Sequence, residues 1–216
     1  MRWQKNYPMR YILYLFILLL SLNNASAQTH IGVDAGYTYS NARIILNDVK
    51  QTSGFRNGFK IELMVDVPFE NKLHFSPTLD YHYTGYQAFY TTGSVKHTEN
   101  NINVVALSPA LSFNFPSGKN KIFIVGFSPV IGVPLGGKEK STFTNDSTSV
   151  DKLKFAIGSD YGQFDLGVST YLSYQIRDLV LKANWFIGLT NLDTNELHLR
   201  NIRDQIFSFT VGYYFK

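Results

Sequence analysis

The sequence contains no cysteine among its 216 residues. This absence excludes disulfide bonds, metal sites built from thiolates and a lipid-modified N-terminal cysteine. Outside one segment near the N-terminus, the sequence lacks a long hydrophobic run, and no segment shows clearly the apolar spacing of an amphipathic helix. It also lacks an internal repeat, a linker or a low-complexity tract that would divide it in two. We therefore expect a single domain in which helices play little part.

A strongly biased segment occupies the first 27 residues. Three basic residues and no acidic residue lie in residues 1–10, a nearly uninterrupted apolar run follows over 11–22, and Ala25-Ser26-Ala27 matches a small-x-small cleavage site. Twelve helical residues would span about 18 Å, against roughly 30 Å of hydrocarbon, so the run is too short for a transmembrane anchor. We expect residues 1–27 to be a cleavable secretory signal peptide and residues 28–216 to form the mature domain.

The basic balance of the sequence comes mostly from this leader. The whole chain carries a formal net charge of +4 at pH 7, and three of the positive charges lie in the leader, which leaves +1 for residues 28–216. So small an excess provides no basic surface, and we expect no nucleic-acid partner.

A period of two dominates the rest of the chain and predicts strands with two different faces. Eight segments have an uncharged row at alternate positions: Ile31–Tyr39, Phe55–Val67, Leu73–Tyr83, Val105–Phe115, Phe123–Val133, Phe164–Ile176, Leu179–Leu189 and Phe207–Phe215. The intervening positions of the same segments carry all the charges: Asp34, Arg56, Lys60, Glu62, Asp66, Asp80, Asp165 and Lys182.

Alternation alone does not say which face is inside. A soluble lipocalin-type barrel points its apolar rows inward, whereas a membrane barrel points them at lipid. The mixed face is rich in small residues such as Gly36, Ser76 and Gly126, which suit the narrow interior of an eight-stranded barrel.

Aromatic residues gather at both ends of the apolar rows. One group is Tyr37, Tyr39, Tyr81, Tyr83 and Phe164, and the other is Phe69, Phe75, Phe113, Phe115, Tyr174, Tyr213 and Phe215. Two such girdles are typical of membrane barrels, although aromatic residues also favour strands in general.

The connections between the segments alternate in length. They cover residues 40–54, 68–72, 84–104, 116–122, 134–163, 177–178 and 190–206. Outer-membrane barrels have short turns on the periplasmic side and long loops outside, a rhythm that a lipocalin does not need. We therefore predict an all-β protein, an eight-stranded antiparallel up-and-down transmembrane β-barrel in the outer membrane.

Three prolines lie inside the predicted strands, at Pro77, Pro109 and Pro129. A closed barrel has no edge strand to accommodate a missing N–H group. We expect bulges or other local irregularity at these positions.

Several stretches resemble a known family of proteins. They are GFRNGFKIELMVDVPF (54–69), FSPTLDYHYTG (75–85), VALSPALSFNF (105–115), GFSPVIGVPLGGK (126–138), QFDLGVSTYLSYQI (163–176), GLTNL (188–192) and FTVGYYFK (209–216). Over most of the mature chain they resemble the PorT-like family of outer-membrane β-barrel proteins, whose members carry similar prolines. The resemblance implies the barrel fold, and through one member type it implies an accessory role in protein secretion. The last strand resembles the signal read by the barrel-insertion machinery, with Phe215 as its aromatic residue, although Lys216 departs from the usual aromatic ending.

Two motifs approach known binding sites. Gly132-x4-Gly137-Lys138 is similar to a phosphate-binding loop, but Glu139 stands where Ser or Thr is needed and no helix follows. A strand that runs into a glycine turn explains it better. His74 and His82 share a strand face, but at about 3.3 Å per residue they lie about 26 Å apart, too far for one metal ion.

A hydrolase site is the third candidate, since some small outer-membrane barrels are lipid hydrolases, acyltransferases or proteases. It would use Asp80 and His82 with the hydroxyl of Ser40 or Ser94. Nucleophile and base must lie within hydrogen-bonding reach, which the sequence does not show.

A filled lumen is the interpretation that we favour for the charged face. Buried charges persist when they are paired. The basic residues Arg56, Lys60 and Lys182 would face the acidic residues Asp34, Glu62, Asp66 and Asp165. We therefore predict no enzyme activity, no cofactor, and no catalytic, cofactor-binding or metal-binding residue.

The role expected from these patterns is a structural or interaction role. The barrel would present extracellular loops to an envelope protein partner, and it would contact outer-membrane lipid and the barrel-insertion machinery. An accessory role in envelope transport or secretion is the alternative, and lipid-modifying catalysis is a third reading. The longest connection, 134–163, is the first candidate for a contact, with Phe143 and Phe155 as anchors. A solvated loop that only shields the surface is equally consistent with its composition.

Overall fold

The computed structural model describes residues 29–215 apart from residues 91–93, 157–158, 160 and 195–199. The predicted signal peptide over residues 1–27 lies outside the described residues, as do Gln28 and Lys216. Among the residues that the structure describes, no helix is long and apolar enough to cross a membrane.

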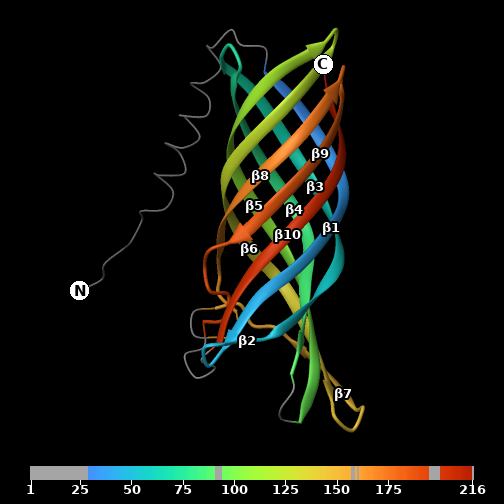
Figure 1. Ribbon diagram of the computed structural model, residues 1–216, viewed down its shortest axis with the longest axis vertical. Helices are drawn as coiled ribbons and strands as arrows, with labels where there is room; N and C mark the ends of the chain where they lie inside the picture. The colour runs from blue at the N-terminus through green and yellow to red at the C-terminus, as the bar shows by residue number, and fades with distance from the viewer. Residues whose placement is uncertain (1–28, 91–93, 157–158, 160, 195–199, 216) are drawn as a thin grey trace, which may run out of the picture.

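The regular elements of the described chain are ten strands. They are β1 (His30–Leu46), β2 (Val49–Lys50), β3 (Thr52–Glu70), β4 (Leu73–Phe89), β5 (Val95–Gly118), β6 (Lys121–Phe143), β7 (Thr148–Lys152), β8 (Asp165–Ile176), β9 (Leu179–Gly188) and β10 (Arg200–Phe215). Eight of them pair in the order β1, β3, β4, β5, β6, β8, β9 and β10, and β10 pairs with β1 to close the ring (Figure 1). All these pairings are antiparallel, so the predicted eight-stranded barrel is confirmed.

The register of the ring fixes how steeply its strands tilt. Following cross-strand partners once round the ring from Val67 leads back to Asn57 on the same strand, a stagger of ten residues. With a rise of about 3.3 Å per residue and strands about 4.8 Å apart, this stagger requires a tilt of roughly 40°. An eight-stranded ring of this kind encloses a space that side chains fill.

Three tight turns lie at one end of the barrel, together with the start of β1 and the end of β10 (Figure 1). The turns are residues 71–72, 119–120 and 177–178, and each has one residue with positive φ, namely Asn71 (37°), Asn120 (61°) and Arg177 (55°). Two-residue hairpin turns need such residues because only these conformations match the twist of the strands. The three short connections lie where they were predicted, but 68–72 and 116–122 are wrong in extent, because β3 continues to Glu70, β5 continues to Gly118 and β6 begins at Lys121. This end is called the short-turn end below.

The opposite end, called the long-connection end, differs from the sequence prediction. The predicted connections 84–104 and 134–163 are wrong in extent, because β4 continues to Phe89, β5 begins at Val95 and β6 continues to Phe143. The predicted connections 40–54 and 190–206 are also partly strand. Beyond the apolar rows the outward positions of β1, β5 and β10 become mostly polar, while inward positions such as Ala42, Ile102 and Ile202 are apolar, so the contrast that defines the rows is lost although backbone pairing continues.

The predicted faces of the strands are confirmed. Ile61 and Leu63 are 53% and 44% exposed, whereas Lys60 and Glu62 between them are 7% and 2% exposed. None of the predicted outward positions is buried in any of the eight ring strands.

The three prolines form one row across β4, β5 and β6. Pro77 pairs with Pro109, and the register of β5 and β6 places Pro109 opposite Pro129. Pairing is interrupted between β5 and β6 at this point and between β3 and β4 beside Pro77, but it resumes in the same register. The expected local irregularity is present as interrupted pairing, but no bulge occurs here, and the nearest register shift on β6 lies at Pro134. In an antiparallel sheet each residue directs its N–H to one neighbour, so a proline interrupts only one of its two ladders.

Apolar side chains fill the barrel at the long-connection end, which the sequence analysis did not predict. This outer core consists of Ala42, Ile44, Tyr86, Ala88, Ile102, Val104, Tyr161, Leu192 and Ile202, with Tyr90, Leu153 and Phe155 packed against it. Tyr161 and Leu192 come from the connections after β7 and after β9, which therefore fold over the opening. The amide of Gly162 joins them by donating to the Leu192 carbonyl at 2.8 Å.

Candidate functional site

Ion pairs cross the middle of the lumen. The Nζ of Lys60 lies 2.6 Å from Glu62 Oε2 and 3.4 Å from Asp80 Oδ2. The Nζ of Lys182, on the opposite wall, lies 2.8 Å from Asp34 Oδ2 and also contacts Glu62. Two ammonium groups are thus shared among three carboxylates from β1, β3 and β4, which confirms the prediction that lumen charges pair and fill the space.

Tyr171 packs beside this cluster from β8. Its ring centroid lies 5.6 Å from Lys182 Nζ, in range of a cation–π contact. The ring covers Gly126 on the neighbouring strand β6, where a Cβ atom would lie 2.1 Å from the ring carbon Cζ. A glycine is required at Gly126 because no side chain fits beneath the ring.

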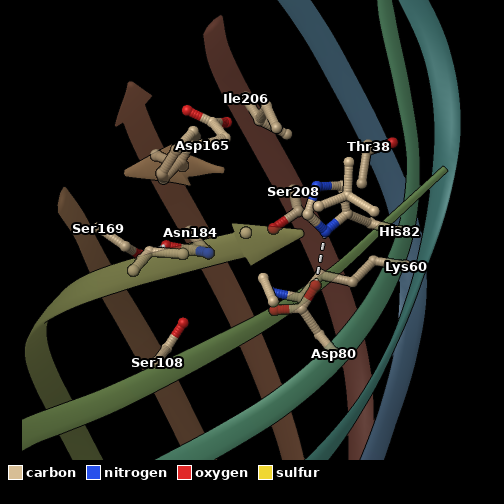
Figure 2. A pocket seen from close by; sticks show the side chains of 15 residues that line it. Thr38, Lys60, Asp80, His82, Ser108, Asp165, Ser169, Asn184, Ile206 and Ser208 are labelled. Atoms are coloured by element: carbon tan, nitrogen blue, oxygen red, sulfur yellow. Dashed lines mark hydrogen bonds and ion pairs between the residues drawn. The ribbon is translucent and has the colours of Figure 1, made fainter. Parts of the chain in front are cut away.

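A cavity lies between the ion cluster and the outer core (Figure 2). Its empty space is about 450 Å³, but little of it is wide enough for water, and we estimate room for about two water molecules. His82 and Asp80 lie on one side of it, with His82 Nδ1 2.6 Å from Asp80 Oδ1. Asp165 and Asn184 face it from β8 and β9 (Figure 2). The cavity is too small for an organic substrate.

Polar contacts continue towards both ends of the barrel. Near the short-turn end, Asp66 accepts a hydrogen bond from Ser76 at 2.8 Å and lies 2.9 Å from His74 Nδ1. Near the long-connection end, Arg56 Nη1 lies 3.2 Å from Glu99 Oε2. The predicted pairing of Arg56 and Asp66 with the other strand charges is therefore wrong, because register brings closer partners that the row analysis did not include.

Asp165 is the other predicted lumen charge, and no described cation lies within ion-pair distance of it. Its Oδ1 accepts a hydrogen bond from Thr190 at 3.4 Å. The predicted ion pair of Asp165 is thus wrong, because β8 begins at this residue and places it above the two lysines.

The hydrolase candidate is not assembled in the described residues. Asp80 and His82 are hydrogen-bonded, but the hydroxyl of Ser40 donates to the Gly85 carbonyl at 2.7 Å and accepts from the Gly85 amide at 3.0 Å. Ser94 lies beyond the cavity in the connection between β4 and β5, where its carbonyl accepts a hydrogen bond from Thr144. Neither serine forms the hydrogen bond to His82 that a nucleophile would need.

The two binding motifs also have structural explanations. Gly132, Gly137 and Lys138 all lie within β6, which continues as a strand to Phe143, so the predicted strand is right and the predicted glycine turn is wrong. His74 and His82 contact different carboxylates, Asp66 and Asp80. No cluster of metal-ligating side chains occurs in the part of the chain that the structure describes.

The outer core is stabilised by buried polar contacts. The phenol groups of Tyr86 and Tyr161 form a hydrogen bond, and Arg200 Nε lies 2.5 Å from Asp193 Oδ2. Burial raises the pKa of the Tyr161 phenol above its ordinary value. Phe155, a predicted contact anchor, lies 5.8 Å from the Tyr161 ring and packs on the core. It therefore closes the barrel and is not a free anchor.

Aromatic pairs lie on the outer surface towards the ends of the apolar rows. Tyr39 stacks on Phe55 with centroids 4.2 Å apart, and Trp185 stacks on Phe207 at 5.5 Å. At the other end, Tyr213 and Phe215 form an edge contact at 5.8 Å. Aromatic side chains thus stand on the outer surface towards both ends of the rows, while on β9 the apolar row continues past Trp185 to Ile187 and Leu189.

Known proteins similar to this chain comprise one family and several solved structures. A family described as outer membrane protein beta-barrel domain matches residues 23–194. No curated protein matches the sequence significantly. One similar solved structure is Ail, the attachment invasion locus protein of Yersinia pestis, in complex with the heparin analogue sucrose octasulfate. It has 11% identity over 86% of this chain and 99% of that chain, with a TM-score of 0.45. Neisserial surface protein A has 16% identity over 86% and 97%, with a TM-score of 0.43. OprG from Pseudomonas aeruginosa has 11% identity over 88% and 97%, with a TM-score of 0.48.

The family match is broader than the PorT-like resemblance and does not reach that finer level. It covers most of the chain, and it agrees with a ring of eight strands that carries an apolar outer surface. This chain therefore belongs to the outer-membrane β-barrel domain family and is an outer-membrane β-barrel protein.

Proposed function

We propose that this protein is a non-enzymatic interaction protein, which presents its long-connection end to a partner at the cell surface. The observation that carries the proposal is a projecting sheet, formed by the ends of β4, β5 and β6 together with β7 (Figure 1). Among the described residues, β7 pairs with β6 alone, so one edge of this sheet is available to another chain. By the rule that short turns face the periplasm, the projecting sheet lies outside the cell.

The filled lumen supports this role over that of a solute pore. The Lys60 and Lys182 ion pairs cross the middle of the barrel, and the outer core closes the long-connection end. A solute would have to displace both. The surface outside the membrane, rather than the interior, is then the part of the molecule that can meet a partner.

An accessory role in envelope transport or secretion is the second candidate, and the PorT-like resemblance favours it. In that role the barrel would bind a component of a secretion system instead of an extracellular ligand. A lipid-modifying enzyme is the third and weakest candidate, since Ser40 is engaged by Gly85 and not by His82. The two interaction roles differ in the identity of the bound partner, which crosslinking can identify.

The decisive experiment removes the projecting hairpin and keeps the outer core. Lys138 and Lys152 are cross-strand partners, so residues 139–151 can be replaced by Asn-Gly, which forms a tight hairpin turn. Leu153 and Phe155 stay, because both pack on the outer core. The shortened protein should still insert and should migrate differently on gels before and after boiling.

Crosslinking in living cells then tests whether the projecting sheet meets a partner. A photoreactive amino acid replaces Val150, which is 61% exposed on β7, and a matched control replaces Leu111, which is 52% exposed on the apolar belt. With the probe at Val150, the full protein should give a protein adduct. With the probe at Lys138, the hairpin-deleted protein should not give that adduct. With the probe at Leu111, only lipid adducts should form. Absence of any protein adduct from the projecting sheet would contradict the proposed function.

A further inference from the structure

The lipid-facing wall has a groove over β6, β8, β9 and β10 near the short-turn end. Counted together with the open space above it, the groove encloses about 680 Å³, and its surface is almost wholly apolar. Two rows of cross-strand partners build it: Leu172, Ala183 and Phe209 in one row, and Tyr174, Leu181 and Val211 in the next. Ala183 has the smallest side chain of the six, so it forms the floor between Leu172 and Phe209.

Basic side chains lie where this groove meets the short-turn end. Lys121 is the partner of Ile176, one row below the groove, and Arg177 follows directly. The Arg177 amide donates to the Asn120 carbonyl at 2.8 Å, so the two turns lie side by side. Lys121 and Arg177 are exposed, and exposed Lys119 adds a third positive charge, against one half-buried acid, Asp178.

Arg177 also occupies an unusual backbone position. Its φ of 55° lies in the left-handed region, where the two other short turns place Asn71 and Asn120. A long side chain is less favourable there than Asn or Gly, so its presence needs a reason outside the local backbone.

From the groove and its basic rim, we infer that this wall binds one phospholipid with an anionic headgroup. An acyl chain lies in the groove over Ala183, and the headgroup phosphate contacts Lys121 and Arg177. In the orientation proposed above, this lipid belongs to the periplasmic leaflet. The positive charges of Lys121 and Arg177 select the anionic headgroup, and the small side chain of Ala183 makes room for the acyl chain.

The dimensions of the wall fit such a ligand. From Leu179 at the rim to Trp185 beyond the groove, β9 has six residue steps, or roughly 20 Å, close to the length of a phospholipid acyl chain. Trp185 faces the lipid and is 42% exposed. The sequence has two tryptophans, and the other, Trp3, lies in the predicted signal peptide. The fluorescence of the mature protein therefore reports on this wall alone.

The test measures quenching of Trp185 by lipids with brominated acyl chains. Full-length mature protein is placed in phosphatidylethanolamine vesicles that contain either brominated phosphatidylglycerol or, at the same fraction, brominated phosphatidylethanolamine. Each basic residue near a membrane surface strengthens binding of anionic lipid about fivefold. We expect the relative affinity for phosphatidylglycerol to be about fivefold or more above that for phosphatidylethanolamine.

Variants separate the headgroup contact from the groove. In the Lys121→Gln/Arg177→Gln protein the preference should fall to about one, while quenching by phosphatidylethanolamine stays the same. Ala183→Phe should reduce quenching by both lipids. Lys72→Gln, a change of an exposed lysine in a different short turn, should keep the preference. The side chains of Lys121 and Arg177 are exposed, so the Lys121→Gln/Arg177→Gln protein should fold. A difference in gel migration between boiled and unboiled samples verifies that it does.

Two results would overturn the inference. Equal quenching of the unaltered protein by the two lipids, or a preference that survives the double substitution, would show that the rim does not select a headgroup. A crosslinked dimer that Ala183→Phe abolishes would show that the groove holds a second copy of the chain instead.

Discussion

Removal of the Lys182 ammonium tests the energetics of the filled lumen. Lys182 is 7% exposed at its side chain, and Asp34, at 2.8 Å, has a side chain with no exposure at all. In Lys182→Met, Glu62 keeps the Lys60 ammonium at 2.6 Å, whereas Asp34 loses its one ion pair among the described residues. The methionine fills most of the vacated volume, so the electrostatic loss dominates.

The expected magnitude follows from the burial of Asp34. Breaking a buried ion pair by removing one partner costs about 3–5 kcal/mol, because an uncompensated charge remains. Asp34→Asn/Lys182→Met removes that charge as well and should recover most of the loss. Lys96→Met is the matched control, since Lys96 and Asp146 pair at 3.5 Å with side chains 62% and 81% exposed. An exposed pair of this kind contributes at most about 1 kcal/mol.

The assay is urea unfolding in detergent micelles or vesicles, followed by Trp185 fluorescence and by the gel shift between folded and unfolded protein. The Lys182→Met midpoint should fall well below that of Lys96→Met. If Lys182→Met costs less than about 1 kcal/mol, or if the added Asp34→Asn change destabilises the protein further, then the lumen charges do not depend on one another as their distances indicate.

Further predictions concern faces, packing and export. Leu63→Cys should react with a lipid-phase probe while Glu62→Cys should not, and the opposite pattern would mean that the strand register is off by one residue. Gly126→Leu should destabilise the barrel by roughly 1–3 kcal/mol or more through a clash with Tyr171, and an unchanged unfolding midpoint would show that the ring can move aside. Sequencing of the protein from outer membranes should show Gln28 at its N-terminus, and an intact leader there would exclude cleavage.

The faces of the strands could be predicted because alternation is a local property. In β3, the contrast between Leu63 and Glu62 needs no knowledge of any other strand. Strand ends could not be predicted from the same signal. Near the start of β5, His97 and Glu99 face away from the core while Thr98 and Asn100 are buried, so both faces are polar and the period of two disappears.

The partners of lumen charges depend on register, which a single sequence does not contain. Arg56 pairs with Glu99 because β3 and β5 lie on either side of β4, where Gly54 is the partner of Gln87 and Gln87 is the partner of Glu99. Glu99 was outside every predicted row. The outer core was missed for a similar reason, since Tyr161 and Leu192 lie in segments without any periodic pattern.

Closure of the ring by β1 and β10 has a consequence for assembly. These strands are the first and the last of the chain, and their partners, from Ile31 with Phe215 to Leu46 with Arg200, are separated by most of its length. Every other ring pair can form between successive hairpin neighbours, but this pair must wait until the C-terminal strand is available. Contacts of such long sequence separation slow folding. Until they form, β1 and the strand added last at the other end of the sheet each expose an unpaired edge. Pairing of β10 with β1 is thus the event after which the barrel can cease to be a template for aggregation.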